Sequence, residues 1–205
     1  NVPSYQAWLD RQSFLLAYRF HRRFLQHLQS EHGGVRWVLK SPGHLAAIED
    51  ILAVYRDACI VHTHRDPVDV MPSLASLSYT LRGMSSDVID PHEVGRQHAE
   101  LWSRHLERAM RARERLRDRR SQFFDVYYED VLRDPVAAVE RIYEHFEIPL
   151  SEEARRRMNS YMVRKPRGEF GVHRYSLEEF GLDRETEVAR FAEYRDRFAP
   201  RASAA

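Results

Sequence analysis

The sequence predicts an α/β fold in which a parallel sheet is flanked by many helices. Three short apolar runs, at about residues 36–39, 58–63 and 122–127, are rich in the β-branched and aromatic residues typical of strands. Each of the first two ends near a basic residue, and a proline that can open a helix follows within a few positions. A helix between two strands with a short return indicates a right-handed parallel crossover.

The expected helices follow from apolar residues at three- and four-residue steps. A long first helix should run from Tyr5 to about Glu31 and end at the glycine pair Gly33-Gly34. Pro72 lies inside a later helix and should bend or restart it, because proline removes a backbone hydrogen bond. Further helices are expected at residues 45–55, 67–79, 92–117, 135–146, 152–163 and 184–198, the last three behind the capping residues Asp134, Ser151 and Asp183.

The composition limits the class of protein. A chain of 205 residues with 43% hydrophobic residues can bury a core of its own, and its length favours a single domain. The 32 Lys and Arg residues balance 31 Asp and Glu residues, so no overall charge attracts nucleic acid, and any anion site must be local. The arginine-rich stretch at residues 111–120 lacks interleaved aromatic residues and is typical of a solvated helix face. Cys59, the only cysteine, excludes an internal disulfide and should be buried in its strand.

Two absences bear on location. No apolar run approaches the length of about 20 residues that a helix needs to cross a bilayer, and no signal peptide is visible, so the sequence favours the cytoplasm. The chain begins with Asn1-Val2-Pro3 rather than with methionine, which favours a fragment or a processed product and leaves an upstream targeting segment open.

The second proline turn has the residue types of a phosphate site. Arg65 lies at the carboxyl end of the expected strand, Asp66 can cap the next helix, and Pro67 suits its first position. Unpaired backbone N–H groups and a guanidinium should then converge. Ser73 lies about two turns further on, on the same side of the helix, and can add a hydroxyl. A local Arg65–Asp66 ion pair, with Ser73 as a small packing residue, is an equally weighted alternative.

These residues and several other motifs resemble the sulfotransferases that use 3′-phosphoadenosine-5′-phosphosulfate (PAPS), in particular their bacterial branch. In that family an arginine and a serine eight positions later grip the donor's 3′-phosphate, and Arg65 and Ser73 have that spacing. The likeness covers nearly the whole chain and depends on the order and spacing of its motifs. These are Leu39-Lys40-Ser41-Pro42-Gly43-His44, His64-Arg65-Asp66-Pro67, Tyr127-Tyr128-Glu129-Asp130, and Gly171-Val172-His173-Arg174-Tyr175-Ser176 followed by Phe180-Gly181-Leu182.

The resemblance implies a P-loop-NTPase-like parallel sheet, PAPS as the co-substrate, and an acceptor hydroxyl on a small molecule, lipid or glycan. It places Lys40, a compact charge, near the transferred sulfuryl group, and Tyr128 against the adenine. A lysine in solvent and a buried core tyrosine are the alternatives. Pro166 and the local spacing depart from the commoner cytosolic pattern in the stretch that resembles a second clasp for the 3′-phosphate. The residues of that clasp would be Arg164, Lys165, Arg167 and Gly168.

His44 is the best visible candidate for the general base that takes the proton of the acceptor hydroxyl, since an imidazole titrates near neutrality. A structural histidine is an equally weighted alternative, and the family's base varies by branch. His62 and His64 alternate on one face of the expected strand, which permits a metal site with His44. Carboxylates and cysteines of suitable spacing do not accompany them, so no metal is expected.

The family's donor-binding loop, a Gly- and Ser/Thr-containing turn after a central amino-terminal strand, has no counterpart in this sequence. We therefore expect residues 1–205 to be the carboxyl-terminal part of one sulfotransferase-like domain, inactive alone, with an open sheet edge through which a homodimer could form. A non-catalytic α/β module that binds a nucleotide or a partner is the main alternative. A nucleotide kinase-like phosphotransferase is disfavoured, because no Lys-bearing phosphate loop is present.

Overall fold

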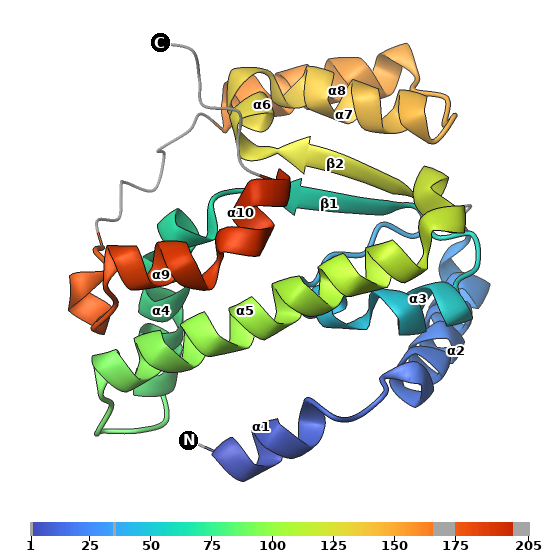
Figure 1. Cartoon of the computed structure of the whole chain (residues 1–205). Helices are drawn as coiled ribbons and strands as arrows, with labels where there is room; N and C mark the ends of the chain where they lie inside the picture. The colour runs from blue at the N-terminus through green and yellow to red at the C-terminus, as the bar shows by residue number, and fades with distance from the viewer. Residues whose placement is uncertain (1, 35, 166–174, 199–205) are drawn as a thin grey trace. The chain divides into compact units, whose positions relative to one another are not determined.

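The computed structural model describes residues 2–34, 36–165 and 175–198 (Figure 1). The chain divides into two compact units, one made of Asn1–Ala58 with His105–Arg120 and the other of Cys59–Arg104 with Ser121–Ala205. Helix α5 (Pro91–Arg115) contributes residues to both units. Within the described ranges, no helix is long and apolar enough to cross a membrane.

The first unit is helical, and its first helix is interrupted. The prediction of one helix from Tyr5 to Glu31 is wrong, because the chain leaves the helical path near Ser13. There the backbone N–H of Phe14 donates to Asp50 Oδ2 over 2.7 Å, and the hydroxyl of Ser13 donates to Asp50 Oδ1 over 2.8 Å. A distant carboxylate thus holds the start of the second helix, a contact that helical periodicity does not reveal. The elements are α1 (Pro3–Leu9), α2 (Leu15–His32), η1 (Pro42–Ala47), α3 (Ile48–Val54) and the end of α5.

Helix α2 ends as predicted at Gly33, whose φ of 60° suits a glycine. The strand predicted at residues 36–39 is not formed, and this irregular segment leaves Val38 91% exposed. A strand needs a ladder partner, and the ladder in the described residues joins two later segments. The predicted crossover from residues 36–39 through α3 is therefore also wrong.

The second unit contains a parallel sheet of two strands. β1 (Ile60–His64) pairs with β2 (Phe123–Tyr127), and His64 lies opposite Tyr127, so both strands are confirmed near their predicted positions. Cys59 lies just before β1 and is exposed, so the prediction of a buried cysteine is wrong: the ladder begins one residue later. A 3₁₀ turn, η2 (Arg117–Gln122), contributes residues to both units and leads into β2. The unit also contains α4 (Pro67–Gly83), α6 (Tyr128–Arg133), α7 (Pro135–His145), α8 (Glu152–Arg164), η3 (Glu178–Phe180), α9 (Arg184–Arg190) and α10 (Ala192–Phe198).

Local capping explains where several helices begin. Four side chains accept a backbone N–H from the first turn of the following helix, over 2.8–3.1 Å: Asp66, Asp134, Ser151 and Asp183. These predicted starts are confirmed. Helix α4 continues through Pro72 without a restart, because its buried side chains, including Met71 and Ala75, stabilise it despite the lost hydrogen bond. The last predicted helix is divided at Phe191 into α9 and α10.

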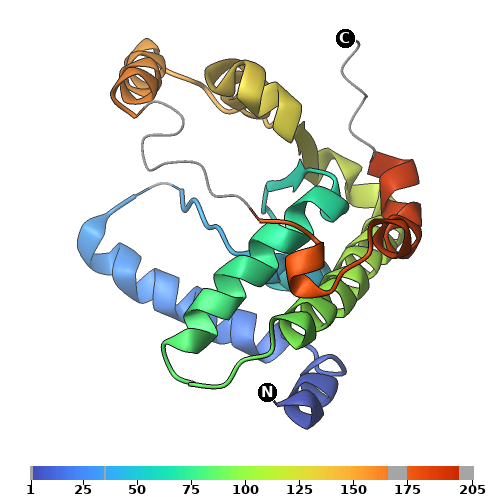
Figure 2. The same cartoon turned by 90° about the vertical axis from the view of Figure 1, so that its left-hand side faces the viewer.

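Gly95 lies in the part of α5 that belongs to the second unit, where the backbone of another segment approaches so closely that a side chain would not fit. A Cβ atom here would lie 2.2 Å from the carbonyl oxygen of Phe180, in η3. The 3₁₀ turn η3 also lies beside α4, as Figure 2 shows. Gly95 therefore lets α5 and η3 come together.

We expect Gly95→Ala to destabilise the protein by about 1–3 kcal/mol, the usual cost of overpacking a rigid contact. The matched control is Gly83→Ala, whose Cβ would meet the side chain of Ile89 at an ordinary 3.8 Å. Because alanine favours helix over glycine, this control should leave stability unchanged or raise it by less than about 1 kcal/mol. Urea unfolding followed by circular dichroism measures both, and equal midpoints would contradict the close approach.

Candidate functional site

Two predicted ligand-binding residues meet at the carboxyl edge of the sheet in the second unit. Arg65 directly follows β1 and Tyr128 directly follows β2, and the last residues of these strands face each other in the parallel register. The guanidinium carbon of Arg65 lies 4.5 Å from the centroid of the Tyr128 ring, a cation–π contact. Open α/β sheets bind ligands at this edge. The register therefore brings together two residues that are far apart in the sequence, at the edge where a ligand is expected.

The carboxylate beside Arg65 is held by another arginine. Asp66 Oδ1 accepts the N–H of Val68. Asp66 Oδ2 accepts a hydrogen bond from Nε of Arg195 in α10 at 3.1 Å and forms an ion pair with its Nη2 at 3.0 Å. Arg65 itself is exposed and forms no ion pair with any residue that the structure describes. Of the two alternatives that the sequence left open, the local Arg65–Asp66 pair is therefore absent. The Arg65 charge remains available to an anion.

Backbone N–H groups contribute less to this edge than predicted. Pro67 has no N–H, and the next three residues of α4 donate theirs to the side chain or the carbonyl oxygen of Asp66. The predicted convergence of unpaired N–H groups is wrong, because the capping aspartate already uses them. Ser73 lies two turns into α4, half-buried, and its hydroxyl forms no hydrogen bond within the described ranges. An anion at this edge would depend on Arg65, with Ser73 as the nearest candidate hydroxyl on α4.

Part of the predicted second clasp lies within the described residues. Arg164 is the last residue of α8, and its Nε donates to the carbonyl oxygen of Ser160 over 3.3 Å. Lys165 follows it and is exposed. Arg167 and Gly168 lie outside the described residues. The clasp therefore stays a prediction.

In the first unit, Lys40 and His44 lie close to the start of η1. Lys40 is exposed in the irregular segment that precedes this helix. Ser41 Oγ accepts the N–H of Gly43 over 3.2 Å and so begins η1. His44 is half-buried, and its Nδ1 lies 2.7 Å from the hydroxyl oxygen of Tyr18 in α2. One exposed cation and one oriented imidazole thus stand within four residues of each other.

Both partners of the Tyr18–His44 hydrogen bond are neutral near neutral pH. Burial, and to a lesser extent the charge of His21, lowers the pKa of His44 below its ordinary value. Burial raises the pKa of Tyr18 to about 12, and Asp50 and Tyr55 add to the shift. The tyrosine keeps its proton while the imidazole can accept one. When His44 Nδ1–H donates to the phenol oxygen, Nε2 presents its lone pair, as a general base requires.

Tyr18 is absent from the sequence-based site, although the sequence carries a signal for it. Tyr18, His21 and Leu25 have the spacing of one helix face, and that face of α2 turns inward, with Leu25 buried. His21 Nδ1 lies 2.7 Å from the hydroxyl oxygen of Tyr55, at the end of α3. Two tyrosine–histidine pairs therefore fix α2 against the segment that carries His44.

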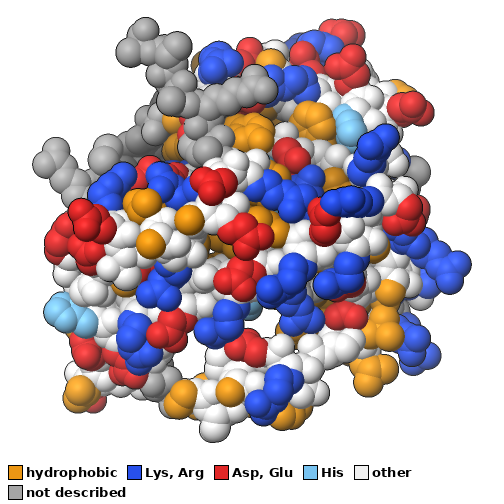
Figure 3. Space-filling model, viewed as in Figure 1, with side chains coloured by type: hydrophobic (Ala, Val, Ile, Leu, Met, Phe, Trp, Pro, Cys, Tyr) orange, Lys and Arg blue, Asp and Glu red, His pale blue; other side chains and the backbone are white. Residues whose placement is uncertain are grey.

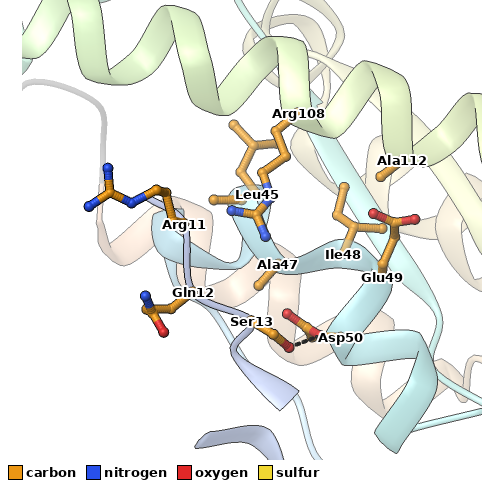
Figure 4. Close-up of a pocket in the computed structure, with 11 residues that line it drawn as sticks. Arg11, Gln12, Ser13, Leu45, Ala47, Ile48, Glu49, Asp50, Arg108 and Ala112 are labelled. Atoms are coloured by element: carbon orange, nitrogen blue, oxygen red, sulfur yellow. Dashed lines mark hydrogen bonds between the residues drawn. The ribbon is translucent and has the colours of Figure 1, made fainter. Parts of the chain in front are cut away.

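A cavity of about 240 Å³ lies next to η1 in the first unit (Figure 4). Arg108 reaches towards it, and its floor includes Leu45 and Ala47. Its Asp50 carboxylate accepts a hydrogen bond from Ser13, and the neighbouring Glu49 accepts hydrogen bonds from Nε and Nη2 of Arg115, at 2.8 and 2.6 Å. None of the predicted site residues is among those lining this cavity, so it does not by itself support the predicted site.

His64, which the sequence pointed to only as a metal ligand, joins three elements of the second unit. Its ring is buried between β2 and α10: Nε2 lies 2.8 Å from Asp125 Oδ1, and Nδ1 lies 2.6 Å from the hydroxyl oxygen of Tyr194. In the tautomer whose Nε2–H donates to Asp125, Nδ1 accepts the hydroxyl proton of Tyr194. Phe198 stacks on the same ring, with centroids 4.3 Å apart. This cluster holds the end of β1 and so positions the adjoining Arg65.

The same cluster contains three side chains of the metal-ligating kinds. Ligand atoms of His62, His64 and Asp125 all lie within 4.8 Å of one another. Both ring nitrogens of His64 already make hydrogen bonds, so a metal ion would have to displace Asp125 or Tyr194 from one of them. The metal site considered from the sequence combined these two histidines with His44. In the structure, the third candidate ligand beside His62 and His64 is Asp125, which lies in the same unit.

Comparisons with known proteins support the family that the sequence motifs resemble. The sequence matches the sulfotransferase family over residues 4–152. The omega-hydroxy-beta-dihydromenaquinone-9 sulfotransferase Stf3 of Mycobacterium bovis and that of Mycobacterium tuberculosis are each 30% identical to it over an alignment of 113 residues. The match covers 53% of this chain and 28% of the relative. The chain therefore corresponds to a minor part of these relatives' length.

Two solved structures resemble the fold. Sulfotransferase STF9 from Mycobacterium avium has a TM-score of 0.85 and 36% identity, and the match covers 95% of this chain and 50% of that one. Sulfotransferase STF1 from Mycobacterium tuberculosis H37Rv has a TM-score of 0.81 and 39% identity, covering 94% of this chain and 49% of that one. The predicted helix-rich, P-loop-like fold with a parallel sheet is confirmed. The family match spans well over half of the sequence, and the chain belongs to the sulfotransferase family.

Proposed function

We propose that the chain is part of a sulfotransferase that moves a sulfuryl group from PAPS to an acceptor hydroxyl. The observation that carries this proposal is the exposed guanidinium of Arg65 at the carboxyl edge of β1, with its neighbour Asp66 already paired with Arg195. An arginine in this state can form a bidentate, charge-assisted contact with a phosphate. The family supports sulfuryl transfer, and the choice of PAPS as donor is part of the proposal.

In the proposed donor site, Arg65 binds the 3′-phosphate and Ser73 donates a hydroxyl hydrogen bond. Arg65 also lies over one face of the Tyr128 ring, 4.5 Å from its centroid. An adenine that stacks on Tyr128 must therefore use the opposite face, or shift Arg65 towards the phosphate. Arg164, Lys165, Arg167 and Gly168 would close over the phosphate as a second clasp.

In the proposed chemical step, His44 Nε2 takes the proton of the acceptor hydroxyl while its oxygen attacks the sulfur. The bond between the sulfur and the bridging oxygen of the donor breaks, and adenosine 3′,5′-bisphosphate leaves. Lys40 neutralises the negative charge that grows on the bridging oxygen. Tyr18 keeps the His44 ring oriented through its hydrogen bond to Nδ1.

The names of two relatives support one class of acceptor. The two Stf3 proteins are named for a hydroxylated dihydromenaquinone, which is a lipid-like molecule. We therefore favour a hydroxyl on a lipid or small molecule as the acceptor, ahead of a glycan. A nucleotide-binding module without transfer activity is the alternative, since it would use the same Arg65 contact and lack turnover.

The length shares support a further part of the proposal. The chain matches about half the length of each of its two structural neighbours. We propose that residues 1–205 form the carboxyl-terminal part of one sulfotransferase domain. The 205-residue polypeptide should then show no sulfuryl transfer in a labelled-PAPS assay, whereas a polypeptide extended to the neighbours' length should. Turnover by the 205-residue chain as a monomer would contradict this view.

Binding of adenosine 3′,5′-bisphosphate tests the donor site directly. Arg65→Ala should weaken binding about ten- to a hundredfold, because it removes a charge-assisted contact of about 1.5–3 kcal/mol. Arg133→Ala is the matched control: Arg133 is also exposed, lies on α6 close to Tyr128, and pairs with Asp130. Titration calorimetry on the extended protein measures both. Equal affinities for wild type and Arg65→Ala would remove the basis of the proposal.

A further inference from the structure

Helix α2 has two faces of different character. The inner face carries Tyr18, His21 and Leu25, which contact other parts of the first unit. On the outer face, large apolar side chains recur every four residues and remain in solvent: Leu16 is 75% exposed, Phe20 73% and Phe24 51%. Because residues four apart lie above one another on a helix, they form one continuous apolar stripe. An exposed stripe of this kind is typical of an interaction surface.

Positive charge lies on the same outer face. Arg19 and Arg23 fall at the positions between the apolar residues, and both are exposed. Neither forms an ion pair with a described residue, and the sequence has no Asp or Glu between positions 15 and 30. In Figure 3, apolar and basic side chains lie together at the lower right, where Figure 1 draws α2. We call Leu16, Arg19, Phe20, Arg23 and Phe24 the outer face of α2.

The exposed apolar side chains and arginines of this face favour one kind of binding partner over another. A second copy of the chain would bring arginines against arginines without a carboxylate between them, which is unfavourable. An anionic lipid surface supplies both complements: phosphate headgroups for the guanidiniums and the acyl boundary for the apolar side chains. The arginine stems can lie along apolar surface while their charged ends reach the headgroups.

We propose that the outer face of α2 binds the surface of an anionic lipid bilayer, with the helix lying in the interface. The proposal goes beyond sulfuryl transfer and does not depend on it, because binding to a surface requires no turnover. It gives the helix two roles on opposite faces: the inner face orients His44 through Tyr18, and the outer face carries the protein to the membrane. A protein that lies on the bilayer could meet a lipid-like acceptor there.

Vesicle co-sedimentation tests this, both on the 205-residue chain and on the polypeptide extended to the length of the structural neighbours. Vesicles of phosphatidylcholine with phosphatidylglycerol should bind the protein, and binding should weaken as salt rises. Arg19→Gln and Arg23→Gln should each reduce binding about fivefold on anionic vesicles and have little effect on phosphatidylcholine alone. Phe20→Ser and Phe24→Ser should each reduce binding about tenfold.

Matched controls distinguish binding through the outer face of α2 from non-specific binding through other exposed apolar or basic side chains. Leu77→Ser with Leu81→Ser removes two exposed apolar side chains, four residues apart, from α4. Arg156→Gln on α8 lowers the charge of the protein by one, as Arg19→Gln and Arg23→Gln each do. Both controls should bind like the wild type. Circular dichroism should show that each variant is folded, because the substituted positions are exposed.

A second measurement does not depend on loss of binding. An environment-sensitive dye on Phe24→Cys, in a Cys59→Ser background, should shift towards an apolar signal when anionic vesicles are added, and a dye on Met162→Cys of α8 should not. No binding by the wild type, equal losses in the controls, or an unchanged dye at position 24 would each overturn the proposal. A dimer in light scattering that Phe20→Ser abolishes would also overturn it, because the face would then belong to a second copy.

Discussion

Lys40→Ala should lower turnover about a hundred- to a thousandfold, the loss typical of removing one group that stabilises transition-state charge. Lys40 is an exposed ammonium at the end of an irregular segment, with no rigid contact to lose, so the substitution should leave the fold intact. Affinity for adenosine 3′,5′-bisphosphate should change little, because the charge that Lys40 neutralises grows only during transfer. Steady-state kinetics with labelled PAPS and titration of the product nucleotide, both on the polypeptide extended to the neighbours' length, measure the two effects separately.

Arg36→Ala is the control for Lys40. It removes an exposed cation from the same segment, four residues earlier, and should leave turnover unchanged. If Lys40→Ala weakened nucleotide binding and turnover by the same factor, Lys40 would be a binding residue with no special role in the transition state.

His44→Ala should lower turnover about a hundred- to ten-thousandfold near neutral pH, the range for loss of a general base. Part of the activity should return at high pH, where the acceptor hydroxyl ionises more readily. The wild type provides a second signature. Burial and His21 lower the pKa of His44, and the base acts only when unprotonated. Activity should therefore persist as the pH falls past the ordinary histidine value of 6.5 and be lost only at the lower pKa.

Tyr18→Phe separates the orientation of His44 from its chemistry. It removes the hydroxyl 2.7 Å from His44 Nδ1 and keeps the aromatic ring, so kcat should fall and the acid limb of the pH profile should move, with KM nearly unchanged. His27→Ala, an exposed histidine of the same helix, should have neither effect. A pH profile that is flat across the acid range in the wild type would assign the base to another residue.

The roles of residues that form hydrogen bonds with near neighbours in the chain could be predicted from the sequence. Asp66, Asp134, Ser151 and Asp183 each cap a helix through an N–H two or three residues away, and such contacts need no information from the rest of the chain. Arg65 and Tyr128 could be placed at one edge because both directly follow strands that were predicted to run in parallel. The order of these motifs also led to the family.

Long-range contacts decided the rest. The break between α1 and α2 depends on Asp50, 36 residues beyond Phe14, and the availability of Arg65 depends on an Asp66–Arg195 pair that spans 129 residues. The segment at residues 36–39 has the composition of a strand but no ladder partner in the described sheet, and composition does not supply a partner. Local hydrogen bonds and helical periodicity are properties of short segments, so the sequence by itself determined the helix starts, the parallel strands and the candidate anion residue. Which carboxylate neutralises which arginine, and which hydroxyl orients His44, depends on how segments pack, and only the tertiary structure decided them.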